Sequence, residues 1–418
     1  MPRKFFFSSF GKSLLILWLA HVVMDFFTGI WPIYKTIAKI DLAKAGLIVG
    51  ISGFLGEILQ LGFGFLCDRG HRKAVLMVGV TLASSIVWIT FTSTLVEAFW
   101  ILLLLMLGSG SFHPAGMGYA GGLSKEHKGK TILLFASGGA LGLGISQLVF
   151  TKVFHSFNGH ALILLIPVAL ILTLISLHKF PQPEQQRKAM TKEELIAPFI
   201  RAWRPLSLLY FAQVTSYSIS LAFLFLLPDL MAGKSSSLWL VMGGSHLCFI
   251  LGSASALPFI GILTDRIGTK KVLLGAILGS ITLLYTLLRT PSLSTAQAIL
   301  LLISLGGFMQ SINPLIVSWG HKIVPESPST ISALLMGFAW CFTNFGPTCA
   351  GYLCSRFQEE AVVTTLSLMG GLLAFTLLFI FLMKEEKEAE EPAADEAMLA
   401  ADSSLPEKQQ DTIGSIVE

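Results

Sequence analysis

Long apolar runs follow one another along almost the whole chain, and they restrict the fold more than any other feature. A helix needs about 20 apolar residues to cross the ~30 Å hydrocarbon core of a bilayer, and on that rule the chain holds about twelve runs. The runs lie near residues 12–34, 45–66, 74–94, 98–121, 131–153, 161–178, 206–228, 238–263, 271–289, 296–318, 330–353 and 362–383. Only 13% of the 418 residues are charged, about half the share in soluble domains. We therefore expect an all-α membrane protein with about twelve transmembrane helices.

The two halves of the chain repeat each other. The stretch "GFLCDRGHRK" at 64–73 follows the second run, and "GILTDRIGTK" at 261–270 follows the eighth run. Likewise, "SFHP" at 111–114 in the fourth run corresponds to "SINP" at 311–314 in the tenth. Both pairs are about 200 residues apart, which indicates one six-helix unit used twice. Such parallel repeats place a substrate site near the midplane, between two pseudo-symmetric bundles.

The polar segments between the runs indicate the domain limits and the orientation. We predict an N-terminal bundle at 1–180, an interdomain loop at 181–204 and a C-terminal bundle at 205–383. In the loop, a capping box of Thr191 and Glu194 favours a short interfacial helix. The acidic tail at 384–418 has few apolar residues, which is typical of a disordered segment. Most of the 29 lysine and arginine residues fall on one side, so both termini are expected in the cytoplasm.

The repeated pattern G-x-L-x-D-R-x-G-x-K, present as "GILTDRIGTK" and with His71 in place of glycine in the first copy, resembles the cytoplasmic loop signature of the major facilitator superfamily. The stretches "HVVMD" in the first run and "GSGSFHPAG" in the fourth resemble the fosmidomycin-resistance branch of its drug exporters. The resemblance implies that the two loops switch the conformation through charge pairs. Anchoring to the cytoplasmic face is the alternative role. The loop residues are Asp68, Arg69, Arg72, Asp265, Arg266 and Lys270. Antiporters of the superfamily carry a Gly-Pro signature in the fifth run, and here the proline is absent.

Ionisable residues inside the apolar runs are candidates for proton coupling. His21 and Asp25 are four residues apart, so they share one face of the first helix. A charge at mid-membrane costs about 2.5–3.5 kcal/mol on insertion scales, so such a pair is rarely kept without a role. Glu57 lies near the middle of the second run. Burial would hold its carboxyl ready to exchange a proton near neutral pH, which makes Glu57 the preferred carrier. A satisfied His–Asp pair and a structural acid are the alternatives.

His113 stands beside Pro114 in the fourth run. The proline removes one helical hydrogen bond, and the nearby glycines carry no side chains, so this part of the helix is narrow and bends easily. We expect a hinged helix with His113 facing the central cavity, where it can bind substrate or exchange protons. A simple kink with a satisfied histidine is the alternative. In the fifth run, Gly138 and Gly142 are expected to permit tight helix packing.

Further polar and aromatic residues of the runs are candidates for binding a substrate. Each could instead lie at a packing seam between helices. They are Gln60, Gln147, Gln213, Tyr217, Gln310, Asn313, Trp340 and Asn344, together with His113.

The expected function is secondary active transport, with protons and one small molecule as the transported species. No G-x-x-x-x-G-K-[ST] motif is present, so ATP does not drive it. We expect no cofactor, no bound metal and no nucleic-acid partner. The expected protein is a monomer in the bacterial inner membrane that exports a drug or metabolite. Uptake of a nutrient is the second hypothesis. A membrane-embedded metal enzyme using His21, Asp25, His113 and Glu57 is less favoured, as is a non-transporting receptor.

Overall fold

The computed structural model describes residues 9–124, 128–181, 197, 199–325, 327–357 and 360–384. These residues form helices and the connections between them, and among them there is no strand. Nine helical stretches of this part are long and apolar enough to cross a membrane, and Leu162–Leu177 is a shorter apolar helix. One of the nine, Leu42–Phe91, contains the second predicted run and most of the third. The all-α membrane fold is confirmed, while the count of twelve crossings stays a prediction.

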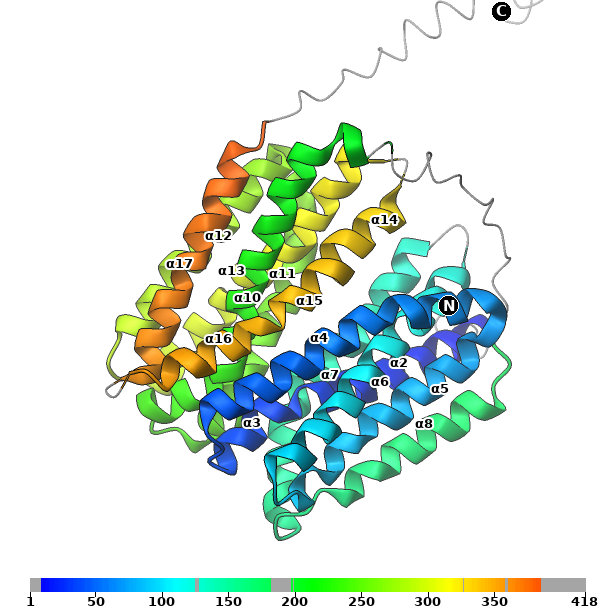
Figure 1. Cartoon of the computed structure of the whole chain (residues 1–418), viewed down its shortest axis with the longest axis horizontal. Helices are drawn as coiled ribbons and strands as arrows, with labels where there is room; N and C mark the ends of the chain where they lie inside the picture. The colour runs from blue at the N-terminus through cyan, green and yellow to red at the C-terminus, as the bar shows by residue number, and fades with distance from the viewer. Residues whose placement is uncertain are drawn as a thin grey trace, which may run out of the picture. The chain divides into compact units, whose positions relative to one another are not determined.

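The first bundle contains the helices drawn from blue to teal in Figure 1. They are α2 (Ser9–Thr28), α3 (Ile30–Ile37), α4 (Leu42–Leu66), η1 (Cys67–His71), α5 (Arg72–Ala83), η2 (Ser84–Phe91), α6 (Leu95–Gly122), α7 (Lys128–Ser156), η3 (Leu162–Leu164) and α8 (Leu165–Leu177). Within this bundle, α2 packs against α7, and α6 packs against both α4 and α5. The approach of α2 to α7 is close because Gly142 has no side chain: a Cβ there would lie 2.1 Å from the carbonyl oxygen of Val22. Gly138 stands similarly close to Trp18, so both glycines permit tight packing as expected.

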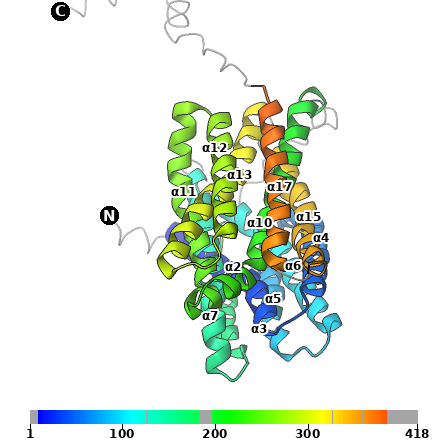
Figure 2. The same ribbon diagram turned by 90° about the vertical axis from the view of Figure 1, so that its left-hand side faces the viewer.

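The second bundle contains the helices drawn from green to orange, and Figure 2 shows α11, α12, α13 and α17 side by side. Its elements are α10 (Trp203–Lys234), η4 (Leu240–Gly244), α11 (Ser245–Ile267), α12 (Thr269–Arg289), α13 (Thr295–Ile323), α14 (Pro328–Ser332), η5 (Ala333–Phe338), α15 (Ala339–Thr343), α16 (Phe345–Cys354) and α17 (Ala361–Leu382). The two bundles belong to one packed unit that ends at Leu382. Of the predicted interfacial helix, 197 and 199–203 are described, and 197 and 199–201 are helical, whereas its capping box lies outside the described residues. Of the acidic tail, only 384 is described.

The repeat is visible in how corresponding helices begin. α6 starts with a capping box in which the Thr94 hydroxyl accepts from the Glu97 amide, and the Glu97 carboxylate accepts in return. α13 starts in the same way, with Ser294 and Gln297. Each helix also contains a proline at the corresponding position. The two halves therefore share not only sequence motifs but also the same kind of N-terminal cap on α6 and α13.

The two signature loops reach their turns by different glycines. Gly70 has a φ of 91° in the first loop, and Gly268 has a φ of 87° in the second. Only glycine adopts this left-handed conformation at little cost. Because the first loop places its glycine one residue earlier after the Asp-Arg pair, His71 can occupy the position where the signature has glycine.

Two helices continue beyond the apolar runs that predict them, and each extension contains a lysine. α3 continues to Ile37, past the run at 12–34, so Lys35 lies inside a helix, and its side chain is fully buried. α10 continues through Pro228 to Lys234. The Lys234 ammonium donates to the carbonyl oxygens of Leu288 (2.9 Å) and Thr290 (2.6 Å), which offsets the cost of its burial.

The bundles are joined tightly at one end of the unit, where α3 ends and α4 begins; we call it the closed end. Here α4 packs along α16, and the two backbones come very close at two glycines. A Cβ on Gly46 would lie 2.3 Å from the carbonyl oxygen of Pro347, and one on Gly351 would lie 2.1 Å from that of Leu42. The Thr348 hydroxyl also donates to the carbonyl oxygen of Gly46 at 2.9 Å.

The bundles separate towards the opposite end of α4, which we call the open end. A Cβ on Gly62 or Gly64 of α4 would meet no atom of the described residues within 4 Å, and the same holds for Gly337 in η5. Figure 1 shows α4 and α14 diverging towards the open end. The described unit is therefore closed at one end and open at the other.

Candidate functional site

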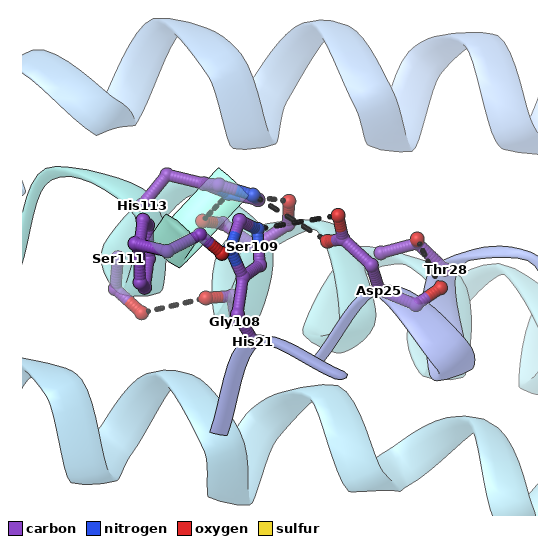
Figure 3. Close-up of polar contacts among 8 residues, drawn as sticks. His21, Asp25, Thr28, Gly108, Ser109, Ser111 and His113 are labelled. Carbon is purple, nitrogen blue, oxygen red and sulfur yellow. Dashed lines mark hydrogen bonds and ion pairs between the residues drawn. The ribbon is translucent and has the colours of Figure 1, made fainter. Parts of the chain in front are cut away.

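Three of the predicted ionisable side chains meet between α2 and α6 in the first bundle. Figure 3 shows the rings of His21 and His113 next to each other, both facing the Asp25 carboxylate. His21 Nε2 lies 3.3 Å from Asp25 Oδ2, and His113 Nε2 lies 3.5 Å from Asp25 Oδ1. The three side chains are exposed by 7%, 34% and 19% for His21, His113 and Asp25, so the group is sheltered but reachable. We call these residues the His–Asp–His cluster.

Backbone carbonyl groups fix the orientation of both rings. His21 Nδ1 lies 2.8 Å from the carbonyl oxygen of Phe135, and His113 Nδ1 lies 2.9 Å from that of Ser109. Because a carbonyl oxygen can only accept, both Nδ1 atoms carry a hydrogen and donate it. The Nε2 atoms of both rings are therefore the positions that gain or lose a proton, and both face Asp25.

α7 completes the surroundings of the cluster. The Phe135 ring stacks on His21 with the centroids 4.2 Å apart. Gly139 is placed so that a Cβ would lie 2.4 Å from Asp25 Oδ2 and 2.5 Å from His21 Nε2. Because Gly139 has no side chain, the α7 backbone lies directly against the Asp25 carboxylate and the His21 ring.

Glu57 lies on α4, within electrostatic range of His113. Its Oε2 atom is buried and has no hydrogen-bond partner among the described residues. α4 and α6 lie close together next to Glu57. A Cβ on Gly110 of α6 would lie 2.4 Å from the carbonyl oxygen of Gly56 on α4 and 3.8 Å from Gln60 Cβ. The structure thus places the two carboxylates, Asp25 and Glu57, around one histidine.

Several predicted binding residues of the second bundle pair with one another. Gln213 of α10 donates from Nε2 to Asn313 Oδ1 of α13 at 2.7 Å, while its Oε1 atom is buried without a partner in the part of the chain that the structure describes. The Ser220 hydroxyl donates to Gln310 Oε1 at 2.9 Å. Asn313, which corresponds to His113 in the repeat, is therefore engaged with its own bundle.

Tyr217, Trp340 and Asn344 lie where the second bundle faces the first. The rings of Tyr217 and Trp340 stack with centroids 5.1 Å apart, and Trp340 Nε1 is buried without a partner among the residues described. Tyr217 lies within electrostatic range of Glu57 and Asp25. The Asn344 side chain packs against α4: a Cβ on Gly53 of α4 would lie 2.2 Å from Asn344 Oδ1. These residues bring the second bundle to the ionisable groups of the first.

Gln147 lies elsewhere. It is fully buried on α7, where η4 crosses, and a Cβ on Gly243 would lie 2.6 Å from Gln147 Cβ. Neither polar atom of its amide has a hydrogen-bond partner within the described ranges. Close by, His246 Nε2 donates to the carbonyl oxygen of Leu143 at 3.0 Å, which is another contact between the bundles. Gln147 therefore belongs to a seam between the bundles rather than to the cluster.

The break expected at Pro114 is absent in this state. α6, described over its whole length, runs as one helix from Leu95 to Gly122 with Pro114 inside it. In the turn before the proline, His113 donates to the Ser109 carbonyl and the Ser111 hydroxyl donates to the Gly108 carbonyl at 2.9 Å. His113 is partly exposed, as the prediction of a residue facing the central cavity requires.

The residues of the signature loops make contacts within their own bundles. Arg72 lies 3.7 Å from Asp68 and also over the Tyr119 ring, while Arg69 lies over the Phe65 ring. Lys270 donates to the Phe381 carbonyl oxygen at 3.4 Å. Asp265 and Arg266 lie at the exposed end of α11. Their expected part in switching stays a prediction.

The sequence reasoning missed an ion pair that joins the bundles at the closed end. The Lys35 ammonium of α3 contacts the Asp229 carboxylate of α10, and the Thr36 hydroxyl donates to the same carboxylate at 3.0 Å. Lys35 also lies 4.7 Å from the centre of the Phe225 ring. The available signal was a lysine and an aspartate near the ends of the first helix of each repeat.

Comparisons with known proteins agree with this architecture. The sequence model of the Major Facilitator Superfamily matches residues 13–243 and 205–411. A Bacillus subtilis (strain 168) protein named as a putative niacin/nicotinamide transporter, NiaP, is 26% identical over 365 residues, which cover 81% of this chain and 87% of the relative. The fosmidomycin resistance protein of Escherichia coli (strain K12) is 22% identical over 372 residues, covering 85% and 88%.

Solved structures show the same fold at lower identity. A mutant of the nucleoside transporter NupG has a TM-score of 0.74 and 13% identity, over 90% of this chain and 100% of that chain. A bacterial homolog of the human lysosomal transporter Spinster has a TM-score of 0.70 and 13% identity, over 91% and 97%. The predicted resemblance is confirmed by the match over nearly the whole chain, and this protein belongs to the Major Facilitator Superfamily.

Proposed function

We propose that this transporter couples the movement of protons to the export of a small drug or metabolite by alternating access. One observation carries the proposal: Glu57 and the His–Asp–His cluster lie together, partly exposed, where the two bundles face each other. In a membrane, ionisable groups placed this way are typical of proton relays and substrate pathways.

Alternating access requires that the bundles rock about the site, so that it opens to one side at a time. With cytoplasmic termini, the open end faces the cytoplasm and the closed end faces the outside. The described state is then inward-facing, in the inner membrane of a bacterium. One protein chain holds both bundles, so a monomer suffices.

Within the site, we assign proton transfer to Glu57 first, and to Asp25, His21 and His113 with it. Glu57 is preferred because its buried Oε2 atom has no hydrogen-bond partner among the described residues, whereas Asp25 has two histidines beside it. One proton moved through 100 mV supplies about 2.3 kcal/mol, which sustains a roughly 50-fold solute gradient.

The substrate would contact the second bundle through the polar groups that lack partners in the described part of the chain. These are the Gln213 Oε1 and Trp340 Nε1 atoms, with Tyr217, Gln310, Asn313, Asn344 and, from the first bundle, Gln60 and His113 around them. Asp25 and Glu57 are the two carboxyl groups assigned to this site, and either of them carries a negative charge when ionised. The site therefore favours a neutral or cationic solute over a strongly anionic one such as a phosphonate.

Uptake of a nutrient is the second candidate function, and one relative indicates a solute class to test for it. A relative that matches most of the chain is named as a putative niacin/nicotinamide transporter. Uptake and export would use the same fold and the same coupling groups, and they differ in whether the solute moves with the proton flow or against it.

A flux measurement distinguishes the two. The full chain is reconstituted in vesicles and offered radiolabelled nicotinamide, nicotinate, uridine or fosmidomycin with the pH gradient imposed in either direction. Export predicts accumulation of a solute against a proton flow in the opposite direction, and uptake predicts accumulation with the proton flow. Flux that is identical in both gradients and in their absence would contradict proton coupling.

A further inference from the structure

The geometry of the His–Asp–His cluster points to a metal site, and we propose that His21, Asp25 and His113 bind one divalent first-row transition-metal cation such as Zn²⁺. The inference does not rest on the proposed proton-coupled export, although its three ligands are also assigned there to proton transfer beside Glu57, and it replaces the expectation of no metal that followed from the sequence alone.

The donor set is the first argument. His21, Asp25 and His113 each offer one ligand atom, two imidazole nitrogens and one carboxylate oxygen, and these three atoms all lie within 4.8 Å of one another. Imidazole ligands suit zinc, iron, nickel and copper, whereas magnesium and calcium prefer oxygen ligands. Three protein ligands also leave at least one coordination position for water or for a solute.

The orientation of the rings is the second argument. Metal-ligating histidines commonly donate their other ring N–H to a backbone carbonyl, which fixes the ring and presents the lone pair. His21 and His113 both do this, through Phe135 and Ser109. In neutral rings, two Nε2 lone pairs then face the negatively charged oxygens of Asp25. That arrangement is repulsive unless a proton or a metal cation lies between them, and a metal cation can satisfy both lone pairs at once.

The distances are the third argument. The two Nε2–Oδ separations of 3.3 and 3.5 Å are longer than the roughly 2.7–2.9 Å of charge-assisted N–H···O bonds. In a tetrahedral site with bonds of about 2.0–2.1 Å, two ligand atoms stand about 3.3–3.4 Å apart. The two Nε2 atoms approach different oxygens of the carboxylate, so both oxygens would face the cation, and the rings, whose centroids are 5.3 Å apart, would have to close on it.

Charge and access are consistent with such a cation. Asp25 and the nearby Glu57 together supply two negative charges when ionised, which balance a divalent ion within the membrane region. The 34% exposure of the His113 side chain gives a route of entry. Gly139 holds the ligands against α7, so this glycine acts as a positioning residue for Asp25 and His21.

The test is a titration of the purified full-length protein, freed of any affinity tag and stripped with a chelator. Zn²⁺ binding is measured by equilibrium dialysis, and Co²⁺ binding by its visible absorption spectrum. We expect one saturable site per chain, with a Co²⁺ spectrum of low-symmetry nitrogen and oxygen coordination.

Three variants then remove one ligand each: His21→Asn, His113→Asn and Asp25→Asn. Asparagine keeps an N–H close to the Nδ1 position, so the bonds to Phe135 and Ser109 are preserved while Nε2 is lost. Each variant is expected to weaken binding by at least about 100-fold, and Gly139→Ala by roughly 10-fold or more. His160→Ala is the matched control, since this exposed histidine stacks on Phe91 away from the cluster.

Absence of saturable binding, or binding that survives all three replacements in variants with an unchanged thermal transition, would overturn the proposal. Either result leaves proton-coupled flux untouched, so failure here is distinct from failure of the proposed function.

Discussion

Lys35 and Asp229 form an ion pair that joins the two bundles at the closed end. The lysine is fully buried, and the aspartate is only 17% exposed. In the state that opens this end, α3 and α10 must separate, and both charges then become available to water. The pair therefore favours the described state only as long as both partners are present.

Loss of one partner should shift the conformational equilibrium towards opening of the closed end. Asp229→Asn leaves the Lys35 ammonium buried without a counter-charge, and such a loss costs about 3–5 kcal/mol. We expect a shift of roughly 100-fold or more in the equilibrium between the two states. Electron paramagnetic resonance distances between spin labels at Ala38→Cys and Ser236→Cys, both accessible positions, report the separation of the bundles at this end.

The charge-swapped variant Lys35→Asp with Asp229→Lys is the control for that experiment. It restores a pair across the same contact, and the short label distance should return in part. An unchanged distance distribution in Asp229→Asn would show that the pair does not stabilise the closed end.

The close backbone contact between α4 and α16 predicts that side chains added there also shift the conformational equilibrium towards opening of the closed end. Gly46→Ala or Gly351→Ala would place a methyl group 2.3 or 2.1 Å from a backbone carbonyl oxygen, so the helices must move apart. We expect both variants to lengthen the label distance and to slow return to the described state. Gly62→Ala on the same helix is the matched control because no atom of the described chain lies within 4 Å of its Cβ position. Equal behaviour of all three variants would refute this explanation.

Gln213 should contribute to substrate affinity through its unpartnered oxygen. Gln213→Leu removes one hydrogen bond of about 0.5–1.5 kcal/mol, so the KM of the transported solute should rise roughly two- to tenfold. Gln147→Leu, at the seam with η4, should leave KM unchanged. Initial rates of vesicle flux at several solute concentrations measure both. A KM that rises in the Gln147 variant and not in the Gln213 variant would reverse these assignments.

Much of the fold could be predicted because lipid constrains it so strongly. A segment in the hydrocarbon core must satisfy its backbone internally, so long apolar runs such as 296–318 had to be helices. The repeat was also readable, since the Asp-Arg loops and the proline pair lie at nearly one offset. Helix ends were less predictable. Lys35 and Asp229 stabilise each other across the bundles, and no local pattern shows that a charged residue will be buried by a partner about 200 residues away.

The site was predictable in its residue types and less so in its partners. His21 and Asp25 follow from helical spacing within one run. That His113 approaches the same carboxylate depends on how α6 packs against α2, which only the fold determines. Gln147 illustrates the opposite case: its type suggested a binding role, but the crossing of η4 at Gly243 buries it in a seam.

The central claim is that Glu57 couples solute movement to protons, and the replacement Glu57→Gln tests it most directly. Glutamine keeps the shape of the side chain but cannot release a proton. The measurement is flux of the transported solute in vesicles, with and without a pH gradient, beside solute exchange at equal pH on both sides.

We predict that Glu57→Gln abolishes accumulation driven by the pH gradient while exchange of labelled for unlabelled solute continues. The unimpaired exchange would show that the protein is folded and still alternates. Accumulation in Glu57→Gln at the rate and extent of the native protein would contradict the account.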